Sequence, residues 1–467
     1  MLFSTTLIPP LAVSLLHGDG EARHFSLTFA IAAVIGLALW WPMRRRETTI
    51  RTRDGFAIVA LLWTAMSLLG AVPFMLVLNV SFADAVFESA SGYTTTGATV
   101  LTGLDLMPRS ILLYRQELQW LGGIGVIVLS VALLPMLGIG GMQLYRAEVP
   151  GPFKDERMTP RIARTARRLS ELYVAFTAVC SLCYWLAGMD AFDAIAHGMA
   201  TVATGGYSTH DASMAYFDSP LIETIAITFM LIGAISFSVH FLAWRMLRLH
   251  LYGQDTQTRA FLLTVAGLTI FVAGVLYVTN QYGGLLESLR YAAFQVVSVI
   301  STTGFATANF ALWPLALPVL LIFSSFIGGC AGSTSGGLKV IRVVILARQA
   351  AVHVRRLIHP RSLNPVRIDG RLVPESIIDG IWGFFTVYVA VFAVLMVALM
   401  LDGVDQVTAF GAVSTSLNNL GPGLGDVAVT FAGMSDLSTL LMAFSMLLGR
   451  LEIFTFLVLL TPAFWRR

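Results

Sequence analysis

Charged residues are scarce in this chain of 467 residues. They make up 12% of it, whereas hydrophobic residues make up 56%. A soluble surface needs a larger charged fraction, so this composition excludes an ordinary soluble protein and is typical of a polytopic membrane protein. The net charge of +3 gives no indication of a nucleic-acid partner. We therefore expect the lipid bilayer to be the main environment of the chain.

Residues that carry enzyme chemistry are also few. The three cysteines, Cys180, Cys183 and Cys330, all lie in apolar segments, where a CxxC pair without other ligands indicates packing rather than a redox or metal site. The eight histidines show no metal-ligand spacing. No paired carboxylates and no nucleophile with a plausible base fall within the apolar segments. An intramembrane enzyme is therefore disfavoured, and we expect no catalytic residue and no bound cofactor.

Long apolar stretches are what the chain has instead. The length leaves room for eight to ten spans, and most stretches reach the roughly 20 residues that a bilayer requires. They cover residues 25–41, 56–78, 116–138, 172–189, 222–243, 261–279, 315–330, 377–401 and 437–464. Residues 7–16 are too few to span a membrane and include Pro9 and Pro10, so we expect half a helix there, or the remnant of a longer one.

Basic residues gather in alternate connections between these stretches. Of the 30 lysines and arginines, 25 lie in residues 44–53, 146–168, 245–259, 339–371 and 466–467. The positive-inside rule makes these five segments cytoplasmic. The other connections hold almost no cations, so we expect them to face the outer side of the membrane.

Four glycine-centred motifs lie in these outward-facing connections. They read YTTTGAT (93–99), VATGGYS (202–208), STTGFAT (301–307) and NNLGPG (418–423). When they are aligned on Gly97, Gly205, Gly304 and Gly421, the intervals are 108, 99 and 117 residues, about one unit of two spanning helices each. Glycine permits backbone conformations closed to other residues. Four such loops in one membrane chain are typical of the four walls of a pore.

Each motif follows a short apolar segment of ten to sixteen residues, which cannot cross a bilayer. Non-helical backbone at membrane depth is tolerated where protein encloses it or where it lines a cavity, as in a re-entrant pore loop. Ordinary outer loops rich in glycine and threonine are the alternative, but four in register disfavour it. We therefore predict an all-α fold of four pseudo-symmetric helix–pore-loop–helix repeats around one pore. The expected parts are an N-terminal helical extension at 1–42 and pore repeats at 54–139, 169–248, 259–356 and 377–465.

The chemistry of the motifs favours a monovalent cation. No aspartate or glutamate lies within the four motif cores, so the ligands on offer are neutral backbone carbonyls. Rings of such carbonyls replace the hydration shell of a monovalent cation, whereas carboxylates would favour a divalent one.

Several long motifs together resemble one family of transporters. Besides the four loops, they are LQWLGGIG (118–125), GGMQLYRAEVPGP (140–152), FIGGCAGSTSGGLKVIR (326–342) and LGRLEIFT (448–455). With these motifs the chain resembles the TrkH-type subunit of bacterial potassium uptake systems, in the Trk, Ktr and HKT superfamily. The resemblance covers nearly the whole chain. The family usually has two extra N-terminal helices, and we expect the chain to begin part-way through the first of them.

The resemblance implies a biological setting and a set of filter residues. The setting is a homodimer in the bacterial inner membrane, with the filter loops facing the periplasm and a cytosolic TrkA-type ring that binds nucleotides. Potassium would bind at the filter. Carried over residue by residue, the filter comprises Thr95, Thr96, Gly97, Ala203, Thr204, Gly205, Thr302, Thr303, Gly304, Asn419, Leu420 and Gly421.

The resemblance also implies a gate below the filter. Arg450 lies mid-way along the last apolar stretch, where a bare cation is costly. In the family an arginine here raises a barrier to cations; an arginine kept for packing is the alternative. Small residues interrupt the seventh long stretch, and the family uses this break as an intramembrane gating loop. Its implied gating residues are Gly328, Gly329, Gly332, Gly336, Gly337 and Lys339. A helix-packing interface of small residues is the alternative here.

The sequence therefore favours potassium uptake through a four-loop filter. Two other functions stay open: a sodium-conducting or proton- or sodium-coupled symporter of the same fold, and an alternating-access solute carrier built on broken helices. Four parallel repeats argue against the carrier, because such carriers usually show two halves. Nucleotide binding by the chain itself is not expected, since Gly337 is not followed by the lysine and hydroxyl of a phosphate-binding loop.

Overall fold

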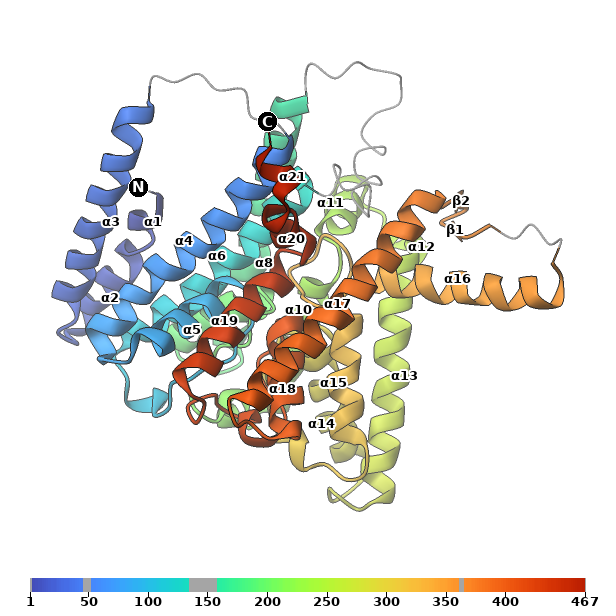
Figure 1. The fold of residues 1–467 in the computed structure, drawn as a ribbon. Helices are drawn as coiled ribbons and strands as arrows, with labels where there is room; N and C mark the ends of the chain where they lie inside the picture. Colours follow the sequence, from blue (N-terminus) through green and yellow to red (C-terminus); the bar gives the residue numbers. More distant parts are fainter. Residues whose placement is uncertain (1, 45–51, 134–157, 361–364, 467) are drawn as a thin grey trace.

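The computed structural model describes residues 2–44, 52–133, 158–360 and 365–466. Most of these residues are helical (Figure 1). Within the described part of the chain, the one departure from the predicted all-α fold is a small antiparallel hairpin, in which β1 (Arg367–Ile368) pairs with β2 (Arg371–Leu372). The predicted GGMQLYRAEVPGP motif and most of the basic segments at 44–53 and 146–168 lie outside the described residues.

The N-terminal extension contains three helices that pack beside the first repeat (Figure 1). They are α1 (Leu2–Thr5), α2 (Ile8–His17) and α3 (Ala22–Met43). The short α2 matches the half helix expected at 7–16, and its two prolines occupy the first turn, where no intrahelical N–H is required. Asp19, which follows α2, accepts a hydrogen bond from the backbone N–H of Ser110 at the start of α6 (Arg109–Leu133), at 3.2 Å. The extension thereby holds the outer end of the first return helix.

The rest of the chain repeats one order of elements four times: a long helix, a short pore helix, a loop and a return helix. The long helices are α4 (Thr52–Leu78), α8 (Met158–Leu186), α13 (Thr256–Val278) and α17 (Glu375–Leu401). The pore helices are α5 (Phe82–Tyr93), α9 (Ala191–Val202), α14 (Leu285–Ile300) and α18 (Gln406–Asn418). The return helices begin with α6, α10 (Pro220–Ala234), α15 (Leu317–Ile327) and α19 (Asp436–Arg450). This order is the predicted one.

The repeats close into a ring through one recurring helix contact. Each return helix packs against the pore helix of the next repeat: α6 against α9, α10 against α14, α15 against α18, and α19 back against α5. The two largest clusters of buried apolar side chains divide this ring. One is centred on repeats 2 and 3, and the other joins the extension to repeats 1 and 4. The four loops that follow the pore helices lie at the centre of this ring.

Two further breaks in return helices were not predicted. The apolar stretches 222–243 and 437–464 are continuous in sequence, yet α10 meets α11 (Phe237–Met246) at a bend of 97° and α19 meets α20 (Phe454–Leu460) at 107°. Leu451 to Ile453 form a turn between α19 and α20, and Glu452 has a positive φ of 53°. Arg450 is therefore the last residue of a helix rather than the middle of one.

Fewer described helices meet a length and hydropathy test for membrane spans than the eight to ten predicted. Five single helices qualify, and the two bent pairs bring the number to seven. The helix α6 does not qualify, because it carries Arg115, Gln116, Glu117 and Gln119 in the middle of its sequence. The third return segment does not qualify because it is interrupted after Ile327. A test based on mean hydropathy misses a helix such as α6 that carries several polar residues.

Candidate functional site

The four pore helices end at the same backbone turn. A backbone N–H beyond each helix donates to the carbonyl five residues earlier: Thr96 to Ser91 (2.9 Å), Gly205 to Ala200 (2.9 Å), Thr303 to Ser298 (2.8 Å) and Leu420 to Thr415 (2.9 Å). The residue before each of these donors has a left-handed backbone, with φ of 52° at Thr95, 49° at Thr204, 55° at Thr302 and 56° at Asn419. The C-terminal ends of four helices, which carry partial negative charge, therefore point into the same four loops.

The loops interlock through glycines that follow these turns. Gly97, Gly206, Gly304 and Gly421 all have positive φ, between 80° and 104°. A Cβ added to each glycine would meet the carbonyl oxygen of the neighbouring loop: Gly205 O at 2.1 Å, Thr303 O at 1.9 Å, Leu420 O at 2.0 Å and Thr96 O at 2.9 Å, respectively. These four contacts form a closed cycle. Four equivalent carbonyls thus surround one axis, each backed by the glycine of the adjacent loop.

This geometry corrects the predicted alignment of the second loop. Gly206, not Gly205, is equivalent to Gly97, because Gly206 has the positive φ and abuts the next carbonyl. The equivalent triplet is Thr204, Gly205 and Gly206, and Ala203 lies one residue before it. Two adjacent glycines made the motif ambiguous, but one signal was present in the sequence. In the first and third loops a threonine stands two positions before the glycine, as Thr204 stands before Gly206.

Side-chain hydrogen bonds hold three of the loops from within the ring. The hydroxyl of Thr96 pairs with that of Thr94 at 2.7 Å, and the hydroxyl of Thr303 pairs with that of Ser301 at 2.7 Å. In the fourth loop the Asn419 amide donates to the hydroxyl of Thr96 at 2.9 Å. The second loop has no side chain at the corresponding position, Gly205. All of these residues are buried, and none is acidic.

The carboxylate close to the first loop is neutralised by an arginine. Glu88 of α5 accepts from Arg115 of α6 at 2.7 Å, and both side chains are fully buried. Arg115 also donates to the carbonyl of Ser208 in the second loop at 3.1 Å. This ion pair therefore joins the first two loops. Nothing in the sequence indicated it, because Glu88 and Arg115 are 27 residues apart.

A histidine outside the membrane-spanning segments links the same two loops. The ring of His210 contacts Asp105 at 2.5 Å and Asp193 at 3.1 Å, and it stacks on Tyr216 at 3.4 Å. Burial alone would lower the pKa of His210, but the hydrogen bonds and charges of Asp193 and Asp105 outweigh it and raise that pKa above 6.5. A protonated His210 therefore favours the folded arrangement of these outer loops.

The sign of this shift gives a prediction on stability. A raised pKa in the folded state contributes stability that is complete below about pH 6.5, the unfolded value, and is lost as pH rises through the folded pKa. We expect His210→Asn to lower the melting temperature of the purified protein at pH 6 and to have a smaller effect at pH 9. Thermal unfolding in detergent at both pH values measures this. An equal loss at both values would show that the charge of His210 contributes nothing.

A loop next to the ring interrupts the third return segment. The helix α15 ends at Ile327 and α16 (Val340–Ile358) begins after Lys339. Between them the backbone touches the ends of two pore helices. The N–H of Gly336 donates to the hydroxyl of Thr302 at 2.6 Å, and the N–H of Gly337 donates to the carbonyl of Asn418 at 3.1 Å. The loop is therefore in direct contact with the third and fourth walls of the ring.

Three of the predicted glycines are required by this close contact. A Cβ on Gly336 would lie 2.0 Å from the carbonyl oxygen of Asn418, and one on Gly328 or Gly337 would lie within 3 Å of neighbouring backbone atoms. Gly329 and Gly332 face the break in the second return helix instead. A Cβ on Gly329 would approach the carbonyl of Ala234 at 2.8 Å, and Gly332 accepts from the N–H of Phe237 at 3.0 Å. The loop that interrupts the third return segment therefore packs into the break between α10 and α11.

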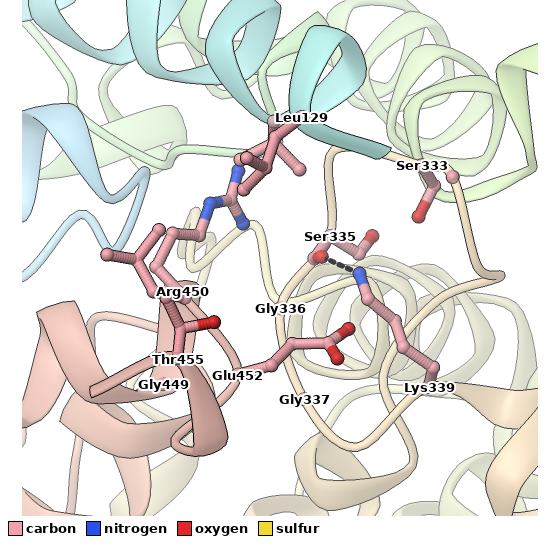
Figure 2. A pocket seen from close by; sticks show the side chains of 13 residues that line it. Leu129, Ser333, Ser335, Gly336, Gly337, Lys339, Gly449, Arg450, Glu452 and Thr455 are labelled. Atoms are coloured by element: carbon pink, nitrogen blue, oxygen red, sulfur yellow. Dashed lines mark hydrogen bonds between the residues drawn. The ribbon is translucent and has the colours of Figure 1, made fainter. Parts of the chain in front are cut away.

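Arg450 lies in a cavity below this ring. The cavity has a volume of about 60 Å³ and is lined by the loop, α6 and the α19–α20 break. Gly449 lets α19 approach the end of α18, because a Cβ there would lie 2.0 Å from the carbonyl oxygen of Leu417. Among the described residues, none of the three guanidinium nitrogens of Arg450 has a hydrogen-bond partner, although the side chain is buried. Figure 2 shows this guanidinium reaching across the cavity toward Leu129.

The other charged groups of the cavity are paired. Lys339, which has a positive φ of 76°, donates to the backbone carbonyl of Ser335 (Figure 2). The carboxylate of Glu452 accepts from Arg342 of α16 at 2.5 Å. Glu452 is therefore paired with Arg342 and does not neutralise Arg450. Five of the gating residues proposed from the sequence line this cavity: Gly332, Gly336, Gly337, Lys339 and Arg450. Gly328 and Gly329 are not among its lining residues.

Four helix–loop–helix repeats closed around one ring of backbone loops define a helical polytopic membrane protein of the pore-loop architecture. Comparison with known proteins then identifies the family. The family model for TrkH, described as a cation transport protein, matches residues 21–467. The chain therefore belongs to the TrkH family of cation transport proteins, which are transporters and not enzymes.

Full-length relatives share about half of the residues of the chain. The Trk system potassium uptake protein TrkH of Escherichia coli (strain K12) is 51% identical, and its namesake in Halomonas elongata is 50% identical. Each alignment covers 100% of this chain and 97% of the relative. The crystal structure of the potassium transporter TrkH from Vibrio parahaemolyticus superposes with a TM-score of 0.93 at 47% identity, covering 100% of this chain and 97% of that one.

Proposed function

We propose that this chain conducts potassium inward across the bacterial inner membrane through the ring of loops. The observation that carries the proposal is the closed cycle in which Thr96, Gly205, Thr303 and Leu420 each present a carbonyl to the glycine of the neighbouring loop. Neutral carbonyls backed by helix C-termini suit a weakly hydrated monovalent cation. The family relationship supports the same ion, since the relatives are named as potassium uptake proteins.

The same proposal includes the orientation and the gate. The filter loops face the periplasm, because basic residues gather on the opposite connections. The loop at residues 328–337 and the cation of Arg450 close the path below the filter. A homodimer in the membrane completes this assignment.

Flux measurements in proteoliposomes test the ion assignment. Potassium, rubidium and sodium fluxes should be measured with and without a pH gradient. Potassium and rubidium flux well above sodium flux, without dependence on the pH gradient, is the expected result. Equal sodium flux would favour the sodium-conducting alternative, and acceleration by the pH gradient would favour a coupled symporter of the same fold.

Regulation by a cytosolic partner is the other part of the proposal. The helix α16 projects sideways from the bundle directly after the gating loop (Figure 1), and it exposes Arg348, Arg355 and Arg356. A basic helix that is continuous with a gate offers a docking face from which a soluble ring can act on the loop. The proposed partner is a TrkA-type ring that binds nucleotides.

Co-elution with that ring is the expected result of purification. We expect a TrkA-type subunit to elute with this chain in size exclusion and nucleotide to change rubidium flux when both proteins are present. Reversing charge with Arg355→Glu and Arg356→Glu should weaken the complex, whereas Arg23→Glu, in the N-terminal extension, should not. Separate elution together with flux that does not respond to nucleotide would contradict the docking proposal.

A further inference from the structure

The second loop has a different support from the other three. At the position of Thr96, Thr303 and Leu420 it carries Gly205, so its wall contains two adjacent glycines, Gly205 and Gly206. A glycine pair lacks both Cβ packing and side-chain hydrogen bonds, and its backbone has the largest conformational freedom. Some other group has to fix this wall if the ring is to keep one shape.

A side chain from α6 supplies that group. The Gln119 amide nitrogen donates to the carbonyl of Gly205 at 2.6 Å, and its amide oxygen accepts from the N–H of Tyr207 at 3.1 Å. The two hydrogen bonds hold the backbone on both sides of Gly206. Gln119 is fully buried, so water does not compete for them. A carbonyl oxygen has two lone pairs and can accept from Gln119 while it coordinates a cation.

Gly205 is a glycine because Gln119 occupies its side-chain space. The φ of Gly205 lies outside the left-handed region, so its backbone conformation is open to any residue. A Cβ at this position would instead meet the amide group of Gln119 at 2.5 Å. Gly205 and Gln119 are therefore a matched pair, in which the side chain for one wall of the ring is delivered from the neighbouring repeat.

Two equivalent return helices carry a different residue at the position of Gln119. Gly122, Gly233 and Gly449 are equivalent, since a Cβ on each would approach the carbonyl of the last residue or the penultimate residue of a pore helix. Three residues before Gly233 and Gly449 stand Met230 and Met446, which are both buried. Methionine has nearly the volume of glutamine but no amide, so it cannot clamp a backbone.

We propose that Gln119 is a positioning residue that sets ion selectivity by clamping the second wall of the filter. The proposal rests on the proposed filter. Without the clamp the Gly205 carbonyl is free to rotate away from the axis, and the ring then loses one of four ligands for a dehydrated cation. Sodium and potassium should then be distinguished less well, while total conduction falls less than selectivity.

Measurement of the potassium-to-sodium permeability ratio in proteoliposomes tests this role. We expect Gln119→Met to lower the ratio about tenfold, which corresponds to the loss of one buried hydrogen bond of ordinary strength or slightly more. The matched control is Gln116→Met, three residues earlier on α6, because the Gln116 amide has no hydrogen-bond partner among the described residues. The control should keep the wild-type ratio.

A paired substitution tests the shared space independently of the hydrogen bonds. We expect Gly205→Ala to lower selective rubidium uptake about tenfold, because the added methyl collides with Gln119. Combining it with Gln119→Ala should recover uptake above that of Gly205→Ala alone. Each variant is compared per folded protein by size exclusion, and the Gly205 pair remains informative if Gln119→Met does not fold.

The outcomes separate this proposal from the filter itself. A wild-type permeability ratio in folded Gln119→Met, or a paired variant no better than Gly205→Ala, would overturn the role of Gln119. Gly304→Ser is the reference, because the hydrogen bonds of Gln119 within the described part of the chain go to the second loop and not to the third. If Gly304→Ser changes the ratio and Gln119→Met does not, the filter stands and the clamp fails. If neither changes it, the filter assignment fails.

Discussion

Replacing Arg450 with alanine should raise cation flux through the protein in the absence of any partner. The guanidinium is buried beneath the ring of carbonyls with no partner for its three nitrogens among the described residues. An unneutralised cation repels a permeating cation strongly in a medium of low dielectric constant. Removing as little as ~1.4 kcal/mol of this barrier raises the rate about tenfold. Rubidium uptake per folded protein in proteoliposomes measures the effect.

A charge-conserving variant separates electrostatics from packing. Arg450→Lys keeps the positive charge and should keep the low basal flux, whereas Arg450→Ala should not. Shortening the loop at residues 328–337 should also raise flux, since that segment contacts the second, third and fourth walls of the ring. If Arg450 serves packing alone, Arg450→Ala will yield less folded protein and no gain of flux. Basal flux at or below wild type in stable Arg450→Ala would refute the barrier.

The second large effect is expected at Gly304. Gly304→Ser forces a side chain into a backbone with φ of 84°, which costs on the order of 1–3 kcal/mol. It also places a Cβ 2.0 Å from the carbonyl oxygen of Leu420, so the fourth wall has to move. We expect potassium uptake or discrimination against sodium to fall at least about tenfold, while membrane insertion is kept. Uptake kinetics and the sodium-to-potassium flux ratio test this.

A glycine of similar backbone conformation provides the control. Gly103 in the first outer loop has φ of 76°, but nothing lies within 4 Å of a Cβ built there. Gly103→Ser therefore carries the backbone strain without the collision. Normal selectivity in Gly103→Ser and impaired selectivity in Gly304→Ser would assign the effect to the contact between loops. Unchanged potassium affinity and selectivity in well-expressed Gly304→Ser would refute the filter assignment.

The sequence was sufficient to predict the repeat order and most of the loops. Apolar stretches of spanning length and glycine motifs at regular intervals are local signals. In the structure the apolar stretches form long helices and the motifs form the loops of the ring. The alignment of the second loop was ambiguous, because Gly205 and Gly206 are adjacent residues of the same type. What distinguishes them is φ and the atoms around a missing Cβ, and these belong to the assembled ring.

The broken helices show a different limit of sequence reasoning. Ser236 and Glu452 are isolated polar residues within the long apolar stretches 222–243 and 437–464, so the average hydropathy of these stretches indicates no interruption. At the break after α10, the backbone carbonyl of Ala234 finds a hydrogen-bond donor in another repeat, because the backbone N–H of Cys330 donates to it at 2.8 Å. Hydrogen bonds between distant segments allow a break that local preference would not produce. The pairing of Arg342 with Glu452, 110 residues apart, escaped prediction for the same reason.

A ring made from one chain can change one wall at a time. In a pore assembled from four identical subunits, any substitution appears in all four walls at once, so a glutamine directed at one carbonyl would be directed at every carbonyl. Here the four walls are separate stretches of sequence, and Gln119 binds the second wall through Gly205 and Tyr207. Mutations can therefore change one of the four walls of such a ring while the other three stay the same. A damaging change in one wall can be offset by a change in its neighbour.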